Sequence, residues 1–179
     1  MKTHNNILRL VISALCLALS YVLPFLTGQI PEIGSMLLPM HIPVLLCGFI
    51  CGWQWGLGVG FIAPLLRSLT LGMPVFFPMA ICMAIELAVY GFSAGLAHKL
   101  FPKKKPFIYL SLFISMVLGR IAFGISMAIS MGAIGKAYTL SAFIASSLTG
   151  AIPGIIIQII LIPILVMVIK SRRGLKLND

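Results

Sequence analysis

Residues 107–131 read FIYLSLFISMVLGRIAFGISMAISM, an apolar run in which Arg120 is the one charged residue. A helix that crosses the hydrocarbon core of a bilayer needs about 20 apolar residues. This stretch is long enough, and residues 107–117 are mostly apolar on every face of a helix, so it predicts a transmembrane helix. An arginine at the middle of such a helix costs about 2.5–3.5 kcal/mol on insertion scales. Arg120 therefore needs a partner, water or a ligand.

Five further stretches approach or exceed the same length, at residues 7–26, 36–51, 53–72, 74–98 and 141–169. The 179-residue sequence is 60% hydrophobic and 9% charged, with a mean hydropathy of +1.14. No soluble fold of this length could hide so much apolar surface from water. The sequence therefore predicts an all-α, polytopic membrane protein, a bundle of six transmembrane helices that forms a single domain over residues 1–179.

The net charge of +10 is concentrated in three basic clusters. They comprise Lys2 with Arg9, Lys99 with residues 103–105, and residues 170–176. With six spans, all three fall on one side of the membrane, and the opposite side has Lys136 as its one basic loop residue. The positive-inside rule then predicts that both termini lie in the cytoplasm. Topology explains the basic surplus, so no nucleic-acid partner is expected.

Several kinds of chemistry lack the residues they need. The one aspartate is Asp179, so an intramembrane aspartyl protease is excluded, and Glu86 has no His-Glu-x-x-His context for zinc. No phosphate-cradling Gly-x-x-x-x-Gly-Lys-Ser/Thr loop occurs. The four cysteines lie within spans, where a free thiol behaves as a small apolar group. We therefore expect no catalytic residues, metal or cofactor, and we do not expect an enzyme.

The charges inside the spans mark a candidate ligand site. With cytoplasmic termini, the two arginines, the glutamate and the histidine that begins the second span could line one cavity that opens outward. The glutamate would pair with one arginine and leave the other to hold a carboxylate or similar anionic group bidentately. A tyrosine one turn below the glutamate and a glutamine in the last span could add neutral hydrogen bonds. The candidate substrate-binding residues are Arg67, Glu86, Arg120, His41, Tyr90 and Gln158.

Two alternatives remain open at this point. The Arg–Glu pair could be a structural tie between spans in a membrane scaffold or accessory protein, with the second arginine reaching lipid headgroups. Small residues that recur four apart, such as Gly48, Gly52, Gly56 and Gly60, favour close packing of helices within the bundle. The pair Ala14 and Ala18 could equally face another subunit.

The sequence resembles the substrate-binding S components of energy-coupling factor (ECF) transporters, which are bacterial vitamin importers. The resemblance covers essentially the whole chain. It rests on six short helices with a basic cytoplasmic fringe and on three stretches, residues 14–18 (ALCLA), 38–48 (LPMHIPVLLCG) and 64–91, which runs from PLLRS through GMP to ELAVYG. The branch it resembles contains S components assigned to pantothenate or left unassigned.

The resemblance implies a mechanism and a set of partners. An S component captures a vitamin from outside and docks against a membrane T component that two cytoplasmic ATPases drive. It implies that Ala14 and Ala18 form the docking surface for the T component. A pantothenate-like anion is the first expectation for the ligand, and its carboxylate would suit a spare arginine. A pyridoxine-like, thiamine-precursor or queuosine-precursor ligand would use the same scaffold with other pocket contacts.

Overall fold

The computed structural model describes residues 2–27, 36–102, 104–144 and 151–173. Its elements are, in order, α1 (Lys2–Val22), η1 (Leu23–Thr27), α3 (His41–Cys51), α4 (Trp53–Leu71), η2 (Phe76–Ala80), α5 (Ile81–Leu100), α6 (Lys105–Ala133), α7 (Leu140–Ile144) and α8 (Ile152–Arg173). These ranges contain no strand. Four stretches of the described chain are long and apolar enough to cross a bilayer, namely Asn5–Leu26, Phe76–Leu100, Lys105–Ala133 and Ile152–Ile169. The prediction of an all-α membrane protein is confirmed.

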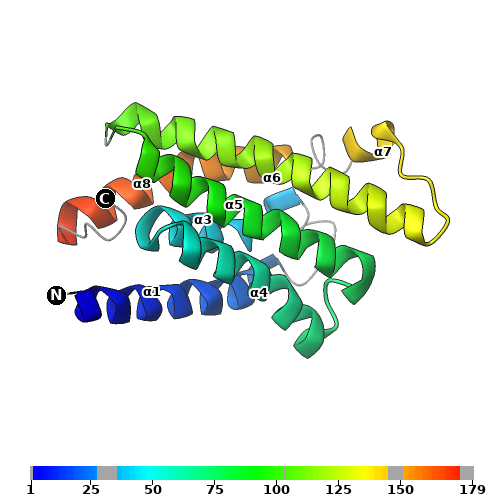
Figure 1. Cartoon of the computed structure of the whole chain (residues 1–179), viewed down its shortest axis with the longest axis horizontal. Helices are drawn as coiled ribbons and strands as arrows, with labels where there is room; N and C mark the ends of the chain where they lie inside the picture. The colour runs from blue at the N-terminus through cyan, green and yellow to red at the C-terminus, as the bar shows by residue number, and fades with distance from the viewer. Residues whose placement is uncertain (1, 28–35, 103, 145–150, 174–179) are drawn as a thin grey trace.

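The helices form an elongated bundle around α5, which packs against α3, α4 and α6 (Figure 1). α1 contacts α3 and α4, and α8 contacts α3 and α6. Figure 1 shows that the start of α1 (blue), the connection between α5 and α6 and the end of α8 (red) lie at one end of the molecule. Arg9, Lys99, Lys104 and Lys105 belong to this end, which we call the basic end. Lys103 and residues 174–176 of the basic clusters lie outside the described residues.

Glycines bring the backbones of α3, α4 and α5 into direct contact. A Cβ atom at Gly48 of α3 would lie 2.5 Å from the carbonyl oxygen of Gly91 in α5, and one at Gly56 of α4 would lie 2.6 Å from the same oxygen. Gly60 and Gly95 have backbone neighbours on facing helices that are equally close. Real Cβ atoms do not approach backbone this closely, so these positions require glycine. The interpretation of this glycine spacing as internal packing is confirmed for these residues.

The second predicted span, residues 36–51, contains a shorter helix than expected. α3 begins only at His41, after Leu38, whose φ is +51°, and Pro39. Its 11 residues rise about 17 Å, roughly half the thickness of the hydrocarbon core. Gly52, with a φ of +103°, turns the chain directly into α4. α3 and α4 therefore form a tight pair that enters the bundle from the end opposite the basic end and returns to it (Figure 1).

The fourth and sixth predicted spans also differ from the observed helices at their starts. In residues 74–98, the regular helix α5 begins at Ile81, and the preceding η2 contains Phe77 in an extended conformation. Phe77 precedes Pro78, and a residue before proline is disfavoured in the α region. In residues 141–169, α7 ends at Ile144 and α8 begins at Ile152, while residues 145–150 lie outside the described residues.

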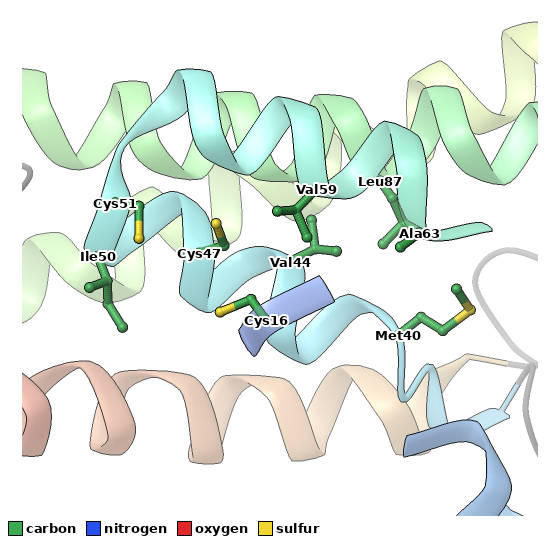
Figure 2. Packing of buried hydrophobic residues seen from close by; sticks show 9 residues of the cluster. All are labelled: Cys16, Met40, Val44, Cys47, Ile50, Cys51, Val59, Ala63 and Leu87. Atoms are coloured by element: carbon green, nitrogen blue, oxygen red, sulfur yellow. The ribbon is translucent and has the colours of Figure 1, made fainter. Parts of the chain in front are cut away.

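A buried apolar cluster fills the space where α1, α3, α4 and α5 meet (Figure 2). Its members are Cys16, Met40, Val44, Cys47, Ile50, Cys51, Val59, Ala63 and Leu87. The cysteines are free thiols, and the Cys47 Sγ lies 3.4 Å from the hydroxyl oxygen of Ser13. They pack as small apolar side chains, as expected for thiols inside a membrane bundle.

Candidate substrate-binding site

Glu86 of α5 and Arg120 of α6 form a buried ion pair. The Arg120 Nη1 donates to the Glu86 Oε1 at 2.9 Å, and the two residues are 8% and 2% exposed. Glu86 lies about 8 Å along α5 from its first residue, Ile81, at the end of α5 opposite the basic end. The attraction between two buried charges offsets the cost of removing them from water only when their other hydrogen-bonding groups are satisfied too. The surroundings of the pair therefore decide what it can do.

His41 and Tyr90 complete a cluster around Glu86. The His41 Nε2 lies 3.5 Å from the Glu86 Oε1, close enough for attraction but outside hydrogen-bond geometry. The Tyr90 ring meets the His41 ring edge-on, with centroids 5.0 Å apart. Tyr90 also packs against Gly119, the neighbour of Arg120, where a Cβ atom would collide with the phenol ring. Gly119 thus lets the ring lie directly against α6.

The cluster contains an unusual concentration of unsatisfied polar atoms. Within the described residues, the Arg120 Nε and Nη2, both ring nitrogens of His41 and the Tyr90 hydroxyl are buried and have no hydrogen-bond partner. A buried donor or acceptor without a partner costs about 1–3 kcal/mol, and more if it is charged. Native proteins contain few such groups, so their gathering at one place makes this cluster the candidate site for a ligand or bound water.

Gln158 of α8 is fully buried, and neither its amide nitrogen nor its amide oxygen has a partner among the described residues. It lies on the same face of α8 as Ile155 and Ile162, since residues three and four apart share a helix face. Those isoleucines pack in the core cluster that includes Tyr90. Gln158 therefore faces the interior of the bundle, on the side of α8 that packs toward Tyr90.

Arg67 of α4 is buried but makes its contacts elsewhere. Its Nη1 donates to the carbonyl oxygen of Tyr21 at 2.9 Å, and its Cζ lies 5.2 Å from the centroid of the Phe25 ring. Tyr21 lies in the last turn of α1, where carbonyl groups lack intrahelical partners, so Arg67 satisfies one of them. Sequence analysis did not identify Tyr21, because a backbone carbonyl has no sequence signature.

The structure thus brings together His41, Glu86, Tyr90 and Arg120 from three helices. It places Gln158 on an interior face that packs toward them. No contact observed in the described chain joins Arg67 to this cluster, and its membership of a ligand site stays a prediction. Arg67 therefore adds no positive charge in direct contact with the Glu86–Arg120 pair.

Ala14 and Ala18 lie on the exposed side of α1. Ser13, Cys16 and Ser20 of the same helix are buried against the bundle. The described part of the protein leaves the two alanines uncovered, together with Val11, which is 58% exposed. This exposure argues against packing of the pair within the bundle, and docking to another subunit stays a prediction.

An apolar helical bundle that buries an ion pair among unpaired polar groups defines an integral membrane protein with a polar interior site. The sequence profile of the family described as "ECF transporter, substrate-specific component" matches residues 8–169. The chain therefore belongs to this family. No curated protein and no solved structure matched the chain.

Membership of the family establishes the general role of the chain. It is a multi-pass membrane protein and a substrate-binding subunit of a transporter rather than an enzyme. The family implies a T component and ATPase subunits as partners. The match is to the family as a whole and does not single out the pantothenate-type branch.

Proposed function

We propose that this chain captures a small carboxylate-bearing nutrient, with a pantothenate-like anion as the first candidate, at the outer side of a bacterial plasma membrane. It then presents the nutrient to a T component that two cytoplasmic ATPases drive. The observation that carries this proposal is the Arg120 guanidinium. Its Nη1 is paired with Glu86, whereas its Nε and Nη2 are buried without a partner among the described residues.

The unpaired nitrogens of Arg120 share one edge of the guanidinium. In that planar group, the N–H bonds of Nε and Nη2 point side by side, and a carboxylate accepts them as two parallel hydrogen bonds. Glu86 occupies a different corner of the same group. Arg120 can therefore keep its internal partner and bind the carboxylate of a ligand at the same time. The Glu86–Arg120 pair is neutral overall, so the ligand carboxylate would be held by oriented donors rather than by a large net charge.

The remaining unpaired groups suit the rest of such a ligand. The Tyr90 hydroxyl and the Gln158 amide can each donate and accept, and a neutral His41 ring does the same with its two nitrogens. Pantothenate carries hydroxyl groups and an amide beside its carboxylate, so it offers partners of both kinds. Ligands without a carboxylate, such as pyridoxine-like compounds, would leave the side edge of Arg120 unpaired.

The orientation of the chain is part of the proposal. If the basic end faces the cytoplasm, as the positive-inside rule predicts, Glu86 lies in the outer half of the bundle. The polar cluster is then positioned to receive a ligand from outside. The exposed face of α1 that carries Ala14 and Ala18 would dock to the T component, because small residues allow a partner helix to approach closely.

The competing function, a scaffold with a structural Glu86–Arg120 tie, uses the same ion pair. It gives no role to the Tyr90 hydroxyl or to the Gln158 amide, which are buried and have no partner in the part of the chain that the structure describes. Those groups would impose a cost on a scaffold that apolar residues would avoid. They therefore favour a ligand site over a tie.

Mass spectrometry tests the proposal directly. The protein is purified from cells grown in rich medium, and small molecules that copurify are released and identified. We expect a stoichiometric carboxylate-bearing vitamin or precursor. Radiolabelled uptake of that compound is then measured in cells that express the chain with and without the T component and ATPases. Equal uptake without these partners would contradict the energy-coupled function.

A further inference from the structure

A groove at the basic end lies between the first turns of α1 and the start of α4. It has a volume of about 610 Å³ and is lined by Asn6, Ile7, Arg9, Leu10, Gln54 and Trp55. Figure 1 shows that α1 and α4 both begin at this end, whereas α5 enters from the other end and carries Glu86 near its start. The groove is therefore separate from the candidate substrate site.

The lining of the groove combines polar and apolar side chains. Asn6, Arg9 and Gln54 supply hydrogen-bonding groups, and Ile7 and Leu10 supply an apolar wall. Trp55 is partly buried and has both properties in one side chain. Tryptophan concentrates where the hydrocarbon core of a membrane meets the headgroups, so Trp55 beside a guanidinium suits a ligand that lies at that boundary.

The charge of the groove is positive. Among the residues that the structure describes, Glu86 is the one acidic residue and lies near the start of α5, away from the groove, whereas Arg9 lines it. Lys99 and Lys104 are exposed at the same end of the molecule. A guanidinium has five donors, so Arg9 can hold an anionic group while it keeps contacts within the protein.

We propose that this groove binds the headgroup of an anionic phospholipid. Arg9, Asn6 and Gln54 donate to the phosphate oxygens, and the first part of the acyl chains lies along Ile7 and Leu10. The lipid would fix the start of α1, whose next turns carry the exposed Ala14 and Ala18. This site takes a lipid and not the transported nutrient, so its test is independent of the proposed transport function.

Tryptophan fluorescence provides the test, because Trp53 and Trp55 are the two tryptophans of the chain. The Trp53→Phe variant of the full chain, purified in a neutral detergent, retains Trp55 as its one tryptophan. It is titrated with phosphatidylglycerol that has brominated acyl chains, or with phosphatidylcholine brominated in the same way. We expect saturable quenching with phosphatidylglycerol at a lipid fraction about fivefold lower than with phosphatidylcholine, and loss of this preference in Arg9→Gln.

Two controls keep the result specific. Lys99→Gln removes a basic residue at the same end but outside the groove and should leave the preference unchanged. Gln54→Ala changes an exposed groove residue without risk to the fold and should weaken it. Equal quenching by the two lipids, or an equal effect of Arg9→Gln and Lys99→Gln, would overturn the proposal. Displacement of the lipid by millimolar inorganic phosphate would assign the groove to a soluble anion and would overturn the proposal too. Quenching that a purified T component relieves, but that does not depend on headgroup charge, would assign the groove to a protein partner and would also overturn it.

Discussion

Arg120 contacts Glu86 through Nη1, and the proposed ligand would bind the edge of the guanidinium formed by Nε and Nη2. The Arg120→Lys variant keeps a positive charge for Glu86 but loses the planar edge that donates two parallel hydrogen bonds to a carboxylate. We expect a 10- to 100-fold weaker affinity for the carboxylate ligand, because a hydrogen bond to a charged group is worth about 1.5–3 kcal/mol. Isothermal titration of the purified protein with pantothenate, or with the copurified compound, measures this change.

The control for Arg120→Lys is the thermal stability of the same sample without ligand. A retained melting temperature with weaker binding supports a ligand site. An unchanged affinity would mean that the carboxylate does not reach Arg120. Collapse of the fold in Arg120→Lys would favour the structural tie.

Arg67 is expected to act on stability rather than on ligand affinity. It joins α4 to the last turn of α1 through the Tyr21 carbonyl and lies over the Phe25 ring. Arg67→Ala should lower the free energy of unfolding by about 2 kcal/mol, the value of a hydrogen bond from a charged donor, and leave ligand affinity within about twofold. Thermal unfolding and ligand titration of one preparation separate the two effects.

Thr70→Ala is a matched control for Arg67→Ala, since Thr70 lies one turn further along α4 and is exposed. Its hydroxyl donates only to the backbone of its own helix in the described structure, to Leu66 at 2.8 Å and Arg67 at 3.5 Å. Lost ligand binding with unchanged stability in Arg67→Ala would place Arg67 in the substrate site, as the sequence predicted.

At the scale of the helices, the contact between α4 and α5 depends on glycine. A Cβ atom at Gly91 would collide with the backbone of Gly56 on α4, and neither backbone can move independently of its helix. We expect Gly91→Ala to destabilise the protein by about 1–3 kcal/mol through overpacking.

Gly58 of α4 is the control, because a Cβ atom there meets nothing within 4 Å. Gly58→Ala should be neutral or stabilise α4 by about 0.5–1 kcal/mol. Equal destabilisation by both variants would show that the helices are not in close contact.

The sequence predicted which stretches are helical better than it predicted the residues at which the helices begin. Apolar length locates α1 and α6 because a bilayer imposes one requirement on both, about 20 apolar residues. It cannot locate the start of α3, since Leu38, Pro39 and Met40 are as apolar as the helix that follows. The same holds before α5, where Phe77 and Pro78 continue the apolar run but not the helix. Backbone restrictions at proline, rather than hydropathy, decide those starts.

The candidate site could be predicted by residue type but not by pairing. Charged residues within apolar spans identify Glu86 and both arginines, because each must find a partner inside the bundle. Which arginine meets Glu86 depends on the rotation of α4 and α6 about their axes, and glycine contacts on α5 and α4 help to set it. The same rotation directs Arg67 to the end of α1, a partner with no signature in the sequence.

For the whole molecule, the gathering of basic residues at one end predicts a measurable orientation. Lys104 belongs to the basic end, and Lys136 follows α6 at the other end; both are exposed. In intact cells, a membrane-impermeant maleimide should label Lys136→Cys, whereas Lys104→Cys should react only after permeabilisation. The four native cysteines are buried, which keeps the background low. The reverse labelling pattern would invert the topology and place the Glu86 cluster in the inner half of the bilayer.

Transport requires that the whole bundle be recognised by another subunit, and the exposed face of α1 is the expected contact. Ala18→Trp fills a surface that a partner helix must approach closely, so we expect uptake of the radiolabelled ligand to fall about tenfold or more. Ligand binding by the purified variant should remain, because Ala18 is exposed on α1 and Glu86 is buried between α5 and α6. Ala128→Trp places the same bulk on an exposed position of α6 and should transport normally. Loss of binding in Ala18→Trp would mean that α1 supports the substrate site, and equal loss of uptake in Ala128→Trp would mean that any enlarged lipid-facing residue impairs transport. This face is assigned to docking only if Ala18→Trp binds the ligand normally but loses uptake, while Ala128→Trp keeps both.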